Sequence, residues 1–486
     1  TASAPTVNQR EALRLLEDYV TDFLLDETGK PHMTPVKNWS TELGKKRTDY
    51  QGNVVAKAVA VTWRQIEPAL PKIGFAARVN VMDLAEGEMA RILSDPSSVI
   101  MPEELWPPRF NNTRVRTVTD DEWGLICKGF YDRGLIRVLD QAGRIRDSTG
   151  QCLGSGFLGV GTGKIVENTA DLEVLRSVFN LPPSNEIQWP ILGDVATLPY
   201  QGMWQGFVFD DSSYFSWFSD DMVSSFFLFR LPDAWSQLFA LERDAPGWAV
   251  GSSQSTVPIG LTIVPPGWLS ANGVIQYLHR RLIAKASILP PQLELRKDRV
   301  RPTDENFMTP SFYSVYVDNL DGGKTANGRQ SDHVEKWFVV ARATGESLGV
   351  LYHVGDKSVS DASFGKTLGA EILAASKTSR PNMSKTMTVL GESFHLLSDP
   401  QPKLKDVEII GGSWVHLIQF RRATMGAVDH LWAVLAGDCA VEDRWILLSD
   451  DLLKLAALTP LLCAKWAQDV DPTVTCSDAS ESGGGV

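Results

Sequence analysis

Apolar residues recur three and four positions apart over the first hundred residues, and this spacing predicts helices. The clearest stripe runs from Leu13 to Phe23, with acidic residues between its apolar positions. Two further helices are expected at residues 54–65 and 84–93. We therefore predict a helical N-terminal region over residues 1–104, to which the sequence assigns no chemistry.

Beyond this region the pattern changes to short runs of apolar, aromatic and β-branched residues, which are typical of strands. Thr119, followed by three acidic residues, predicts the start of a helix that ends at Gly134. A second helix is expected at residues 269–282. The expected strands lie at residues 135–139, 173–180, 215–221, 238–241, 312–317, 348–353 and 368–373.

The run from Phe312 to Asp321 is the most informative of these strands. Aromatic and β-branched residues fill its first part, and Asp, Asn and Gly residues follow, which predicts a β-hairpin with an acidic turn. An aspartate at such a tip is held rigidly and can bind a hard cation through oxygen. An ordinary surface hairpin with a polar turn has the same pattern.

The last third of the chain returns to helical spacing over residues 384–436. The longest apolar segment, between Trp445 and Trp466, is interrupted by charged residues and by Pro460. It is therefore predicted to be a buried helix rather than a membrane span. The tail from Pro472 is expected to form a strand that runs into glycines and stops, as in a fragment of a longer polyprotein.

Composition and charge narrow the range of functions. The chain has 486 residues and a mass of 53.5 kDa, which is enough for more than one compact unit. Its net charge of −12 counts against a nucleic-acid binder that uses its whole surface. A local basic stretch at residues 280–301 is compatible with either a phosphate contact or a solvated face.

The five cysteines are scattered, odd in number and without a Cys-x-x-Cys pair. This pattern indicates reduced thiols in an intracellular protein, either cytoplasmic or nuclear, and no zinc motif. The chain also begins without the basic and apolar pattern of a secretion signal, so it is not expected to be secreted.

Two features between residues 154 and 180 are candidates for binding an anion. A glycine-rich stretch ends at Lys164, but it is not a P-loop, because the spacing differs and no Ser or Thr follows the lysine. Its glycines would let backbone N–H groups approach a triphosphate, although a flexible hairpin explains them equally well. Arg176 lies among apolar residues, as expected of an arginine that is either salt-bridged or directed at an anion.

In their order along the chain, five short motifs resemble those of reverse transcriptases from retroelements, and look closest to the retrotransposon-type enzymes of dinoflagellate genomes. Tyr316-Val317-Asp318-Asn319 is similar to the family's Tyr-x-Asp-Asp box, with Asn319 in place of the second aspartate. The resemblance covers residues 115–436. The other similar motifs are Leu175-Arg176 with Asn180, Val264-Pro265-Pro266-Gly267-Trp268 with Gln276, Leu348-Gly349 with Lys357, and Leu368-Gly369-Ala370-Glu371.

The resemblance implies an α+β fold of the right-hand polymerase type, with fingers, palm and thumb and an antiparallel palm sheet. Residues 105–374 would form the fingers and palm, and residues 375–440 a thumb-like helical region. Residues 441–486 would form a connection and the truncated start of a ribonuclease H-like domain, which Ser477-Asp478-Ala479-Ser480 resembles. RNA-directed DNA polymerase activity is also implied, with an RNA or DNA template-primer and deoxynucleoside triphosphates as partners and no membrane.

In this family two Mg²⁺ or Mn²⁺ ions, held by aspartates from adjacent strands, support the chemistry. Four residues compete for the first aspartate position, namely Asp210, Asp211, Asp220 and Asp221. We assign Asp221, because Phe226 then falls on the family's aromatic position. The resemblance implies that Asp221, Asp318 and the Met222 carbonyl oxygen bind the metal, with Asn319 beside them.

The remaining residues of the implied site would contact the nucleotide. Arg176 would bind the triphosphate, with Lys164 as a weaker candidate. Phe226 would lie under the sugar and exclude a 2′-hydroxyl group, which is what distinguishes the two kinds of nucleotide. Gly267 would let the backbone approach the base pair, and Gln276 would face the template.

Lys357 would donate a proton to the leaving pyrophosphate. Because Asn319 removes one negative charge from the box, weaker metal binding is expected. An alternative hypothesis is therefore a decayed, reverse-transcriptase-like scaffold that binds nucleic acid or protein without catalysis. Metal binding discriminates between the two hypotheses, whereas a chance resemblance would be excluded if Asp221 and Asp318 meet on adjacent strands.

Overall fold

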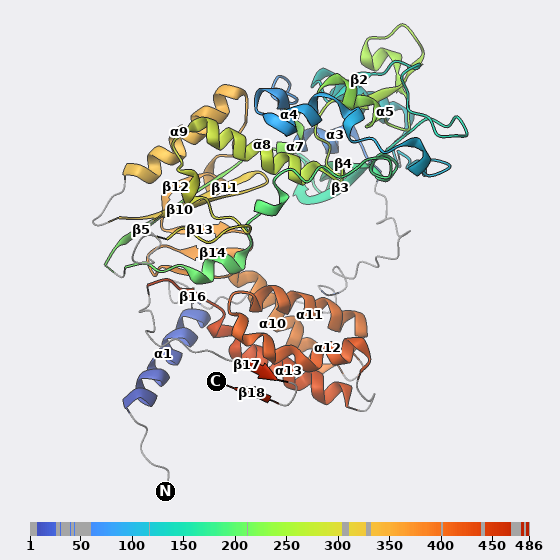
Figure 1. Ribbon diagram of the computed structural model, residues 1–486. Helices are drawn as coiled ribbons and strands as arrows, with labels where there is room; N and C mark the ends of the chain where they lie inside the picture. Colours follow the sequence, from blue (N-terminus) through green and yellow to red (C-terminus); the bar gives the residue numbers. More distant parts are fainter. Residues whose placement is uncertain are drawn as a thin grey trace.

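The structure is a mixture of helices and antiparallel sheets (Figure 1). It is a computed structural model, and the residues that it describes are 7–25, 30, 39, 43, 60–115, 117–210, 212–303, 311–326, 332–399, 402–438, 443–467, 478–480 and 483–485. None of the described helices is both long and apolar enough to cross a membrane.

The N-terminal part does not form a unit of its own. Helix α1 (Val7–Leu24) lies beside the 3-10 turn Thr459–Leu461. Helices α3 (Trp63–Ile66) and α4 (Gly87–Ser94) lie instead in the upper body of Figure 1. Apolar residues from Val61 onward belong to the largest hydrophobic core, together with residues as distant as Val350. Described residues on both sides of residue 104 thus share one core. The first part of the helix expected at 54–65 lies outside the described residues.

The next elements follow the sequence pattern closely. Helix α5 (Asp120–Asp132) begins at Thr119, whose side chain accepts a hydrogen bond from the Glu122 N–H, and ends at Gly134 with a φ of 69°. Strand β2 (Ile136–Val138) follows. Strands β3 (Gly156–Ile165) and β4 (Glu173–Asn180) then form an antiparallel hairpin. The glycine-rich stretch thus forms one side of a hairpin whose register shifts between Gly161 and Ile165.

A central four-stranded sheet organises the molecule. Its order is β10 (Ser311–Tyr316), β11 (Asn319–Ala326), β5 (Tyr214–Asp221) and β12 (Val359–Ala362), and every neighbouring pair is antiparallel. Helices α8 (Ala271–Ala286) and α9 (Asp332–Leu348) pack against this sheet.

The two faces of the central sheet contact different cores, because successive side chains of a strand point to opposite sides. Phe218 and Val315 belong to the largest core, on the side of the helices. Trp217 and Phe312 belong instead to an aromatic cluster on the opposite face. That cluster is completed by Trp466 from near the end of the chain. Both faces are therefore buried along most of the sheet.

In Figure 1 a second sheet lies below the central sheet, and a helical bundle forms most of the lower body. The sheet has the order β13 (Phe364–Thr367), β14 (Ala370–Leu373), β15 (Thr378–Pro381) and β16 (Ala464–Lys465). The bundle consists of α10 (Met383–Ser398), α11 (Leu404–Ile418), α12 (Asp429–Ala436) and α13 (Arg444–Leu458), which share one hydrophobic core. Helix α13, which lies beyond residue 440, thus shares the core of the three helices before it.

Two expected strands are absent as regular elements. Residues 238–241 form only isolated bridges at Ala240 and Leu241, and residues 348–353 form a single bridge at Tyr352. The elements not yet named are short: α6 (Pro182–Asn185), α7 (Ser225–Leu228), β1 (Val79–Asn80), β6 (Phe229–Arg230), β7 (Ala245–Pro246), β8 (Thr256–Val257), β9 (Ile259–Leu261), β17 (Asp478–Ser480) and β18 (Gly483–Gly485).

Candidate active site at the end of the central sheet

The structure brings Asp221 and Asp318 together where two neighbouring strands of the central sheet end. Asn319, the first residue of β11, lies opposite Asp221, the last residue of β5. Asp318 stands one residue earlier, in the turn, and its carbonyl oxygen accepts a hydrogen bond from the Met222 N–H at 3.0 Å. The predicted hairpin is therefore present, and its acidic tip lies beside the end of β5.

Helix α8 holds this turn from behind. Val317 has a φ of 53°, a left-handed conformation that is unfavourable for a β-branched residue. The Gln276 side chain accepts a hydrogen bond from the Val317 N–H at 2.8 Å and donates one to the Val315 carbonyl at 2.9 Å. The His279 Nδ1–H donates to the Val317 carbonyl at 3.0 Å. Burial lowers the pKa of His279 to about 4, so its ring is neutral at pH 7.

The expectation that Gln276 faces the template is wrong. Its side chain is completely buried, and its amide group is used by the hairpin and by Thr197. Gln276 therefore supports the turn that carries Asp318, and it has no surface left for a base pair.

The two carboxylates at the end of the sheet repel each other. Burial, followed by the charge of Asp221, raises the pKa of Asp318 to about 6. Two neighbours lessen the repulsion. The Asn319 amide donates a hydrogen bond to the Asp318 carboxylate at 3.2 Å, and the Lys357 ammonium lies 2.7 Å from the Asp221 carboxylate. Lys357 therefore lies at the acidic site, as its motif implied.

His353 is a member of this site that the sequence analysis missed. Its backbone N–H donates to the Asp221 carbonyl at 2.8 Å, and its Nε2 atom lies 3.9 Å from the Asp221 carboxylate. Burial and the neighbouring charge of Lys357 lower the pKa of His353. The only signal in the sequence is its position four residues before Lys357.

The two cations of the β3–β4 hairpin lie close enough to act on this site. The charge of Arg176 opposes the rise in the pKa of Asp318, and the charge of Lys164 contributes to the lowered pKa of His353. Both side chains are exposed. An anion approaching the acidic pair would therefore find positive charge on the hairpin side.

Gly267 is required by the packing of the fold. Its φ is 106°, and a Cβ atom at this position would lie 2.2 Å from the Phe179 carbonyl oxygen. The structure thus shows a close approach between the loop before α8 and strand β4. Phe226 is half-buried in α7, four residues after Met222, which is buried.

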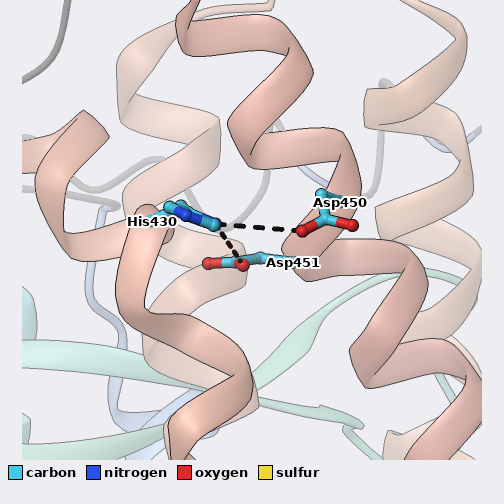
Figure 2. A group of neighbouring side chains, drawn as sticks. All are labelled: His430, Asp450 and Asp451. Atoms are coloured by element: carbon cyan, nitrogen blue, oxygen red, sulfur yellow. Dashed lines mark hydrogen bonds and ion pairs between the residues drawn. The ribbon is translucent and has the colours of Figure 1, made fainter.

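One other group has the composition of a metal site. In the part of the chain that the structure describes, His430, Asp450 and Asp451 are the one set of three such ligands within reach of each other (Figure 2). The Asp451 carboxylate accepts hydrogen bonds from His430 and from the Leu431 N–H at 2.9 and 2.8 Å. Lys454 forms an ion pair with Asp450. These contacts make the group a salt-bridge network at the start of α12.

Comparison with known proteins gives structural likenesses only. No protein-family model matches this chain, and no curated protein matches its sequence. Among 185 matching chains of solved structures, the foamy viral protease-reverse transcriptase dRH in complex with double-stranded DNA gives a TM-score of 0.44 and 12% identity. That match covers 76% of this chain and 56% of the viral one.

A second structure, of the foamy viral protease-reverse transcriptase in complex with double-stranded DNA, gives a TM-score of 0.44 and 11% identity. It covers 94% of this chain and 69% of the viral chain. This chain thus spans little more than half the length of the first structure and about two thirds of the second. With TM-scores below 0.5, neither likeness establishes the fold or the function.

Proposed function

We propose that this chain is an RNA-directed DNA polymerase of retroelement type. In this proposal the central sheet is the palm, the β3–β4 hairpin belongs to the fingers, and the α10–α13 bundle is the thumb. The main support is the register of β5 and β11, which sets Asp221 opposite Asn319 and beside the Asp318 turn. The Lys357 ammonium and the exposed Arg176 side chain also place positive charge near this acidic pair.

The residues present suit a hard divalent cation. The side chains of Asp221 and Asp318 and the Met222 carbonyl are oxygen ligands. A bound cation would offset the burial and the repulsion by Asp221 that raise the pKa of Asp318. Two Mg²⁺ or Mn²⁺ ions held there would stabilise charge on the attacking and leaving oxygens of phosphoryl transfer. Asn319 contributes an amide in place of a carboxylate, so we expect weaker metal binding than in a site with three acids.

The other residues would bind and orient the nucleotide. Arg176 and Lys164 would hold its triphosphate, and the half-buried ring of Phe226 would leave no room for a 2′-hydroxyl. Lys357 would donate a proton to the leaving pyrophosphate. In the structure its ammonium lies at the Asp221 carboxylate, within the candidate site.

Primer extension on an RNA template tests this proposal. The native chain, Asp318→Ala and Asn319→Asp would be compared with deoxynucleotides and either Mg²⁺ or Mn²⁺. We expect extension by the native chain, a loss on the order of 10²-fold or more in Asp318→Ala, and tighter Mn²⁺ binding in Asn319→Asp. Extension that survives Asp318→Ala unchanged would refute the site.

A second function is favoured by one observation: the Asn319 amide and the Lys357 ammonium already satisfy the two carboxylates. The chain would then be a scaffold that binds nucleic acid without catalysis. Electron paramagnetic resonance of added Mn²⁺ separates the two functions. A scaffold binds a fluorescent RNA–DNA duplex but no Mn²⁺, and neither Asp318→Ala nor Asn319→Asp changes its duplex affinity.

A further inference from the structure

A second buried aspartate precedes Asp221 directly but points to the other side of the sheet. Asp220 is 2% exposed and faces the helices, because neighbouring residues of β5 alternate between the two faces. A buried carboxylate is costly unless it is paired and hydrogen-bonded. Its partners therefore show what this position does.

The main partner is Arg342 of helix α9. One terminal guanidinium nitrogen donates to the Asp220 carboxylate at 3.1 Å and to the Ser358 hydroxyl at 2.5 Å, and the other donates to the His353 carbonyl at 3.2 Å. The Ser358 hydroxyl itself donates to Asp220 at 2.8 Å. One guanidinium group thus connects β5 with two points of the segment from Gly349 to Ser358.

The guanidinium has little freedom to move. Glu346, one turn further along α9, accepts a hydrogen bond from it at 3.0 Å. The rings of Tyr352 and Phe338 lie 5.2 and 5.9 Å from its central carbon. Arginine is suited to this role, since its planar group can donate in several fixed directions and stack on rings at once.

The segment 349–358 carries both His353 and Lys357, the two basic groups beside Asp221. It contains no regular strand. Two backbone hydrogen bonds join it to the chain around the end of β5, from the His353 N–H to the Asp221 carbonyl and from the Val223 N–H to the Leu351 carbonyl. Beyond His353 it forms a 3-10 turn at Gly355–Lys357 and enters β12 at Val359. Between these points, Arg342 and Ser358 tie it to Asp220. Lys357 lies directly before Ser358.

We propose that Arg342 and Asp220 are positioning residues. This pair on the helix side of the sheet keeps the Lys357 ammonium at the Asp221 carboxylate on the opposite side. The role of Lys357 as a proton donor rests on the proposed function. Its placement by Arg342 does not, and it can be measured without any activity.

Zero-length coupling with a water-soluble carbodiimide measures this placement, because it joins an amine only to a carboxylate in contact with it. We expect an amide between Lys357 and Asp221 in the native chain, detected by mass spectrometry of the digested protein. Arg342→Met should lower its yield about three- to fivefold, the range expected when an exposed ion pair loses its support. The Lys128–Asp132 pair, 2.9 Å apart on α5, is the internal control and should not change.

Single-turnover nucleotide incorporation measures the consequence. Arg342→Met should lower the rate constant with little change in nucleotide affinity, and Arg342→Lys should restore part of it. In a Lys357→Met background the Arg342→Met change should have no further effect, because Arg342 acts through Lys357. Arg91→Met, which removes the surface pair with Glu88 on α4, is the matched control and should leave incorporation unchanged.

Equal coupling yields in the native chain and in folded Arg342→Met would overturn the inference, as would the absence of the Lys357–Asp221 amide in the native chain. If Arg342→Met does not fold, Ser358→Ala removes the hydroxyl link alone and should lower the yield in the same direction. If no form incorporates nucleotides, the proposed function fails, and the coupling yields still decide whether Arg342 positions Lys357.

Discussion

At the scale of single residues, the site depends on one strained backbone position. Val317 has a left-handed conformation that costs on the order of 1–3 kcal/mol, and the side chains of Gln276 and His279 hold it there. The strain sets the direction in which the next residue, Asp318, leaves the turn. We therefore infer that the α8 side chains determine the geometry of the acidic pair without touching it.

Two buried groups near this turn predict opposite responses to pH. His279 has a pKa of about 4 in the folded chain and 6.5 ordinarily, so the unfolded chain binds more protons between these values and stability is lost as pH falls. Burial raises the pKa of Asp321 to about 6, so here the folded chain binds more protons and stability is lost as pH rises from 4 to 6.

Urea unfolding at pH 4 and pH 7 checks both signs. Compared with the native chain, His279→Gln should lose less stability on acidification, and Asp321→Asn should gain less. Each difference should be on the order of 2–3 kcal/mol. Parallel pH profiles for the native chain and either variant would contradict the assignment for that residue.

At the scale of elements, local patterns predicted β10, β11 and β5 of the central sheet but not β12. The hairpin, the β4 strand and the acidic end of β5 could all be expected, because aromatic and β-branched residues alternate there with polar ones up to a turn. The strand expected at 238–241 was wrong, since a four-residue apolar run carries no period and here follows a short helical turn at Asp233–Gln237.

The supports of the site could not be predicted in the same way. Gln276 and Val317 lie 41 positions apart, and Arg342 and Asp220 lie 122 apart. Their pairing depends on how α8 and α9 pack against the sheet, for which the sequence contains no local signal. His353 was missed for the same reason. The candidate acids could be found from the sequence, and the residues that hold them could not.

Glycine positions give a prediction at this scale. Gly267→Ala should destabilise the fold by roughly 2–3 kcal/mol or more, because its φ of 106° is strained for alanine and the new Cβ would meet the Phe179 carbonyl. Gly412→Ala is the matched control. Gly412 lies within α11, is exposed and has nothing near its Cβ position, so alanine should stabilise by about 0.5–1 kcal/mol. Equal Tm changes in the two variants would contradict the stated cause.

At the scale of the whole molecule, an aromatic cluster joins the two sheets. Phe215, Trp217 and Phe312 of the central sheet share it with Ile372 of the second sheet and with Trp466. Trp466 also bonds through its backbone, accepting from the Phe209 N–H at 2.7 Å. The second sheet therefore packs, through this cluster, against the central sheet that carries the acidic site.

Trp466→Ala tests this connection. The side chain is 1% exposed and its ring lies 5.3–5.5 Å from those of Phe207, Phe209 and Phe215, so its loss should cost about 3–5 kcal/mol. Thermal unfolding should occur at a lower temperature. Trp432→Ala, at a position 47% exposed, should change stability by about 0.5 kcal/mol or less. Similar losses of stability in the two variants would argue against a stabilising contact between the two sheets through this cluster.

The route of the chain through the second sheet has one further consequence. The chain leaves this sheet at Pro381, builds the whole helical bundle, and returns at Ala464 in the neighbouring strand, paired with Ser379. An insertion whose two ends lie side by side can be exchanged without rethreading the rest of the fold. The bundle could thus be replaced by a short turn or by another bundle, and its contribution to function could be measured separately from that of the sheets.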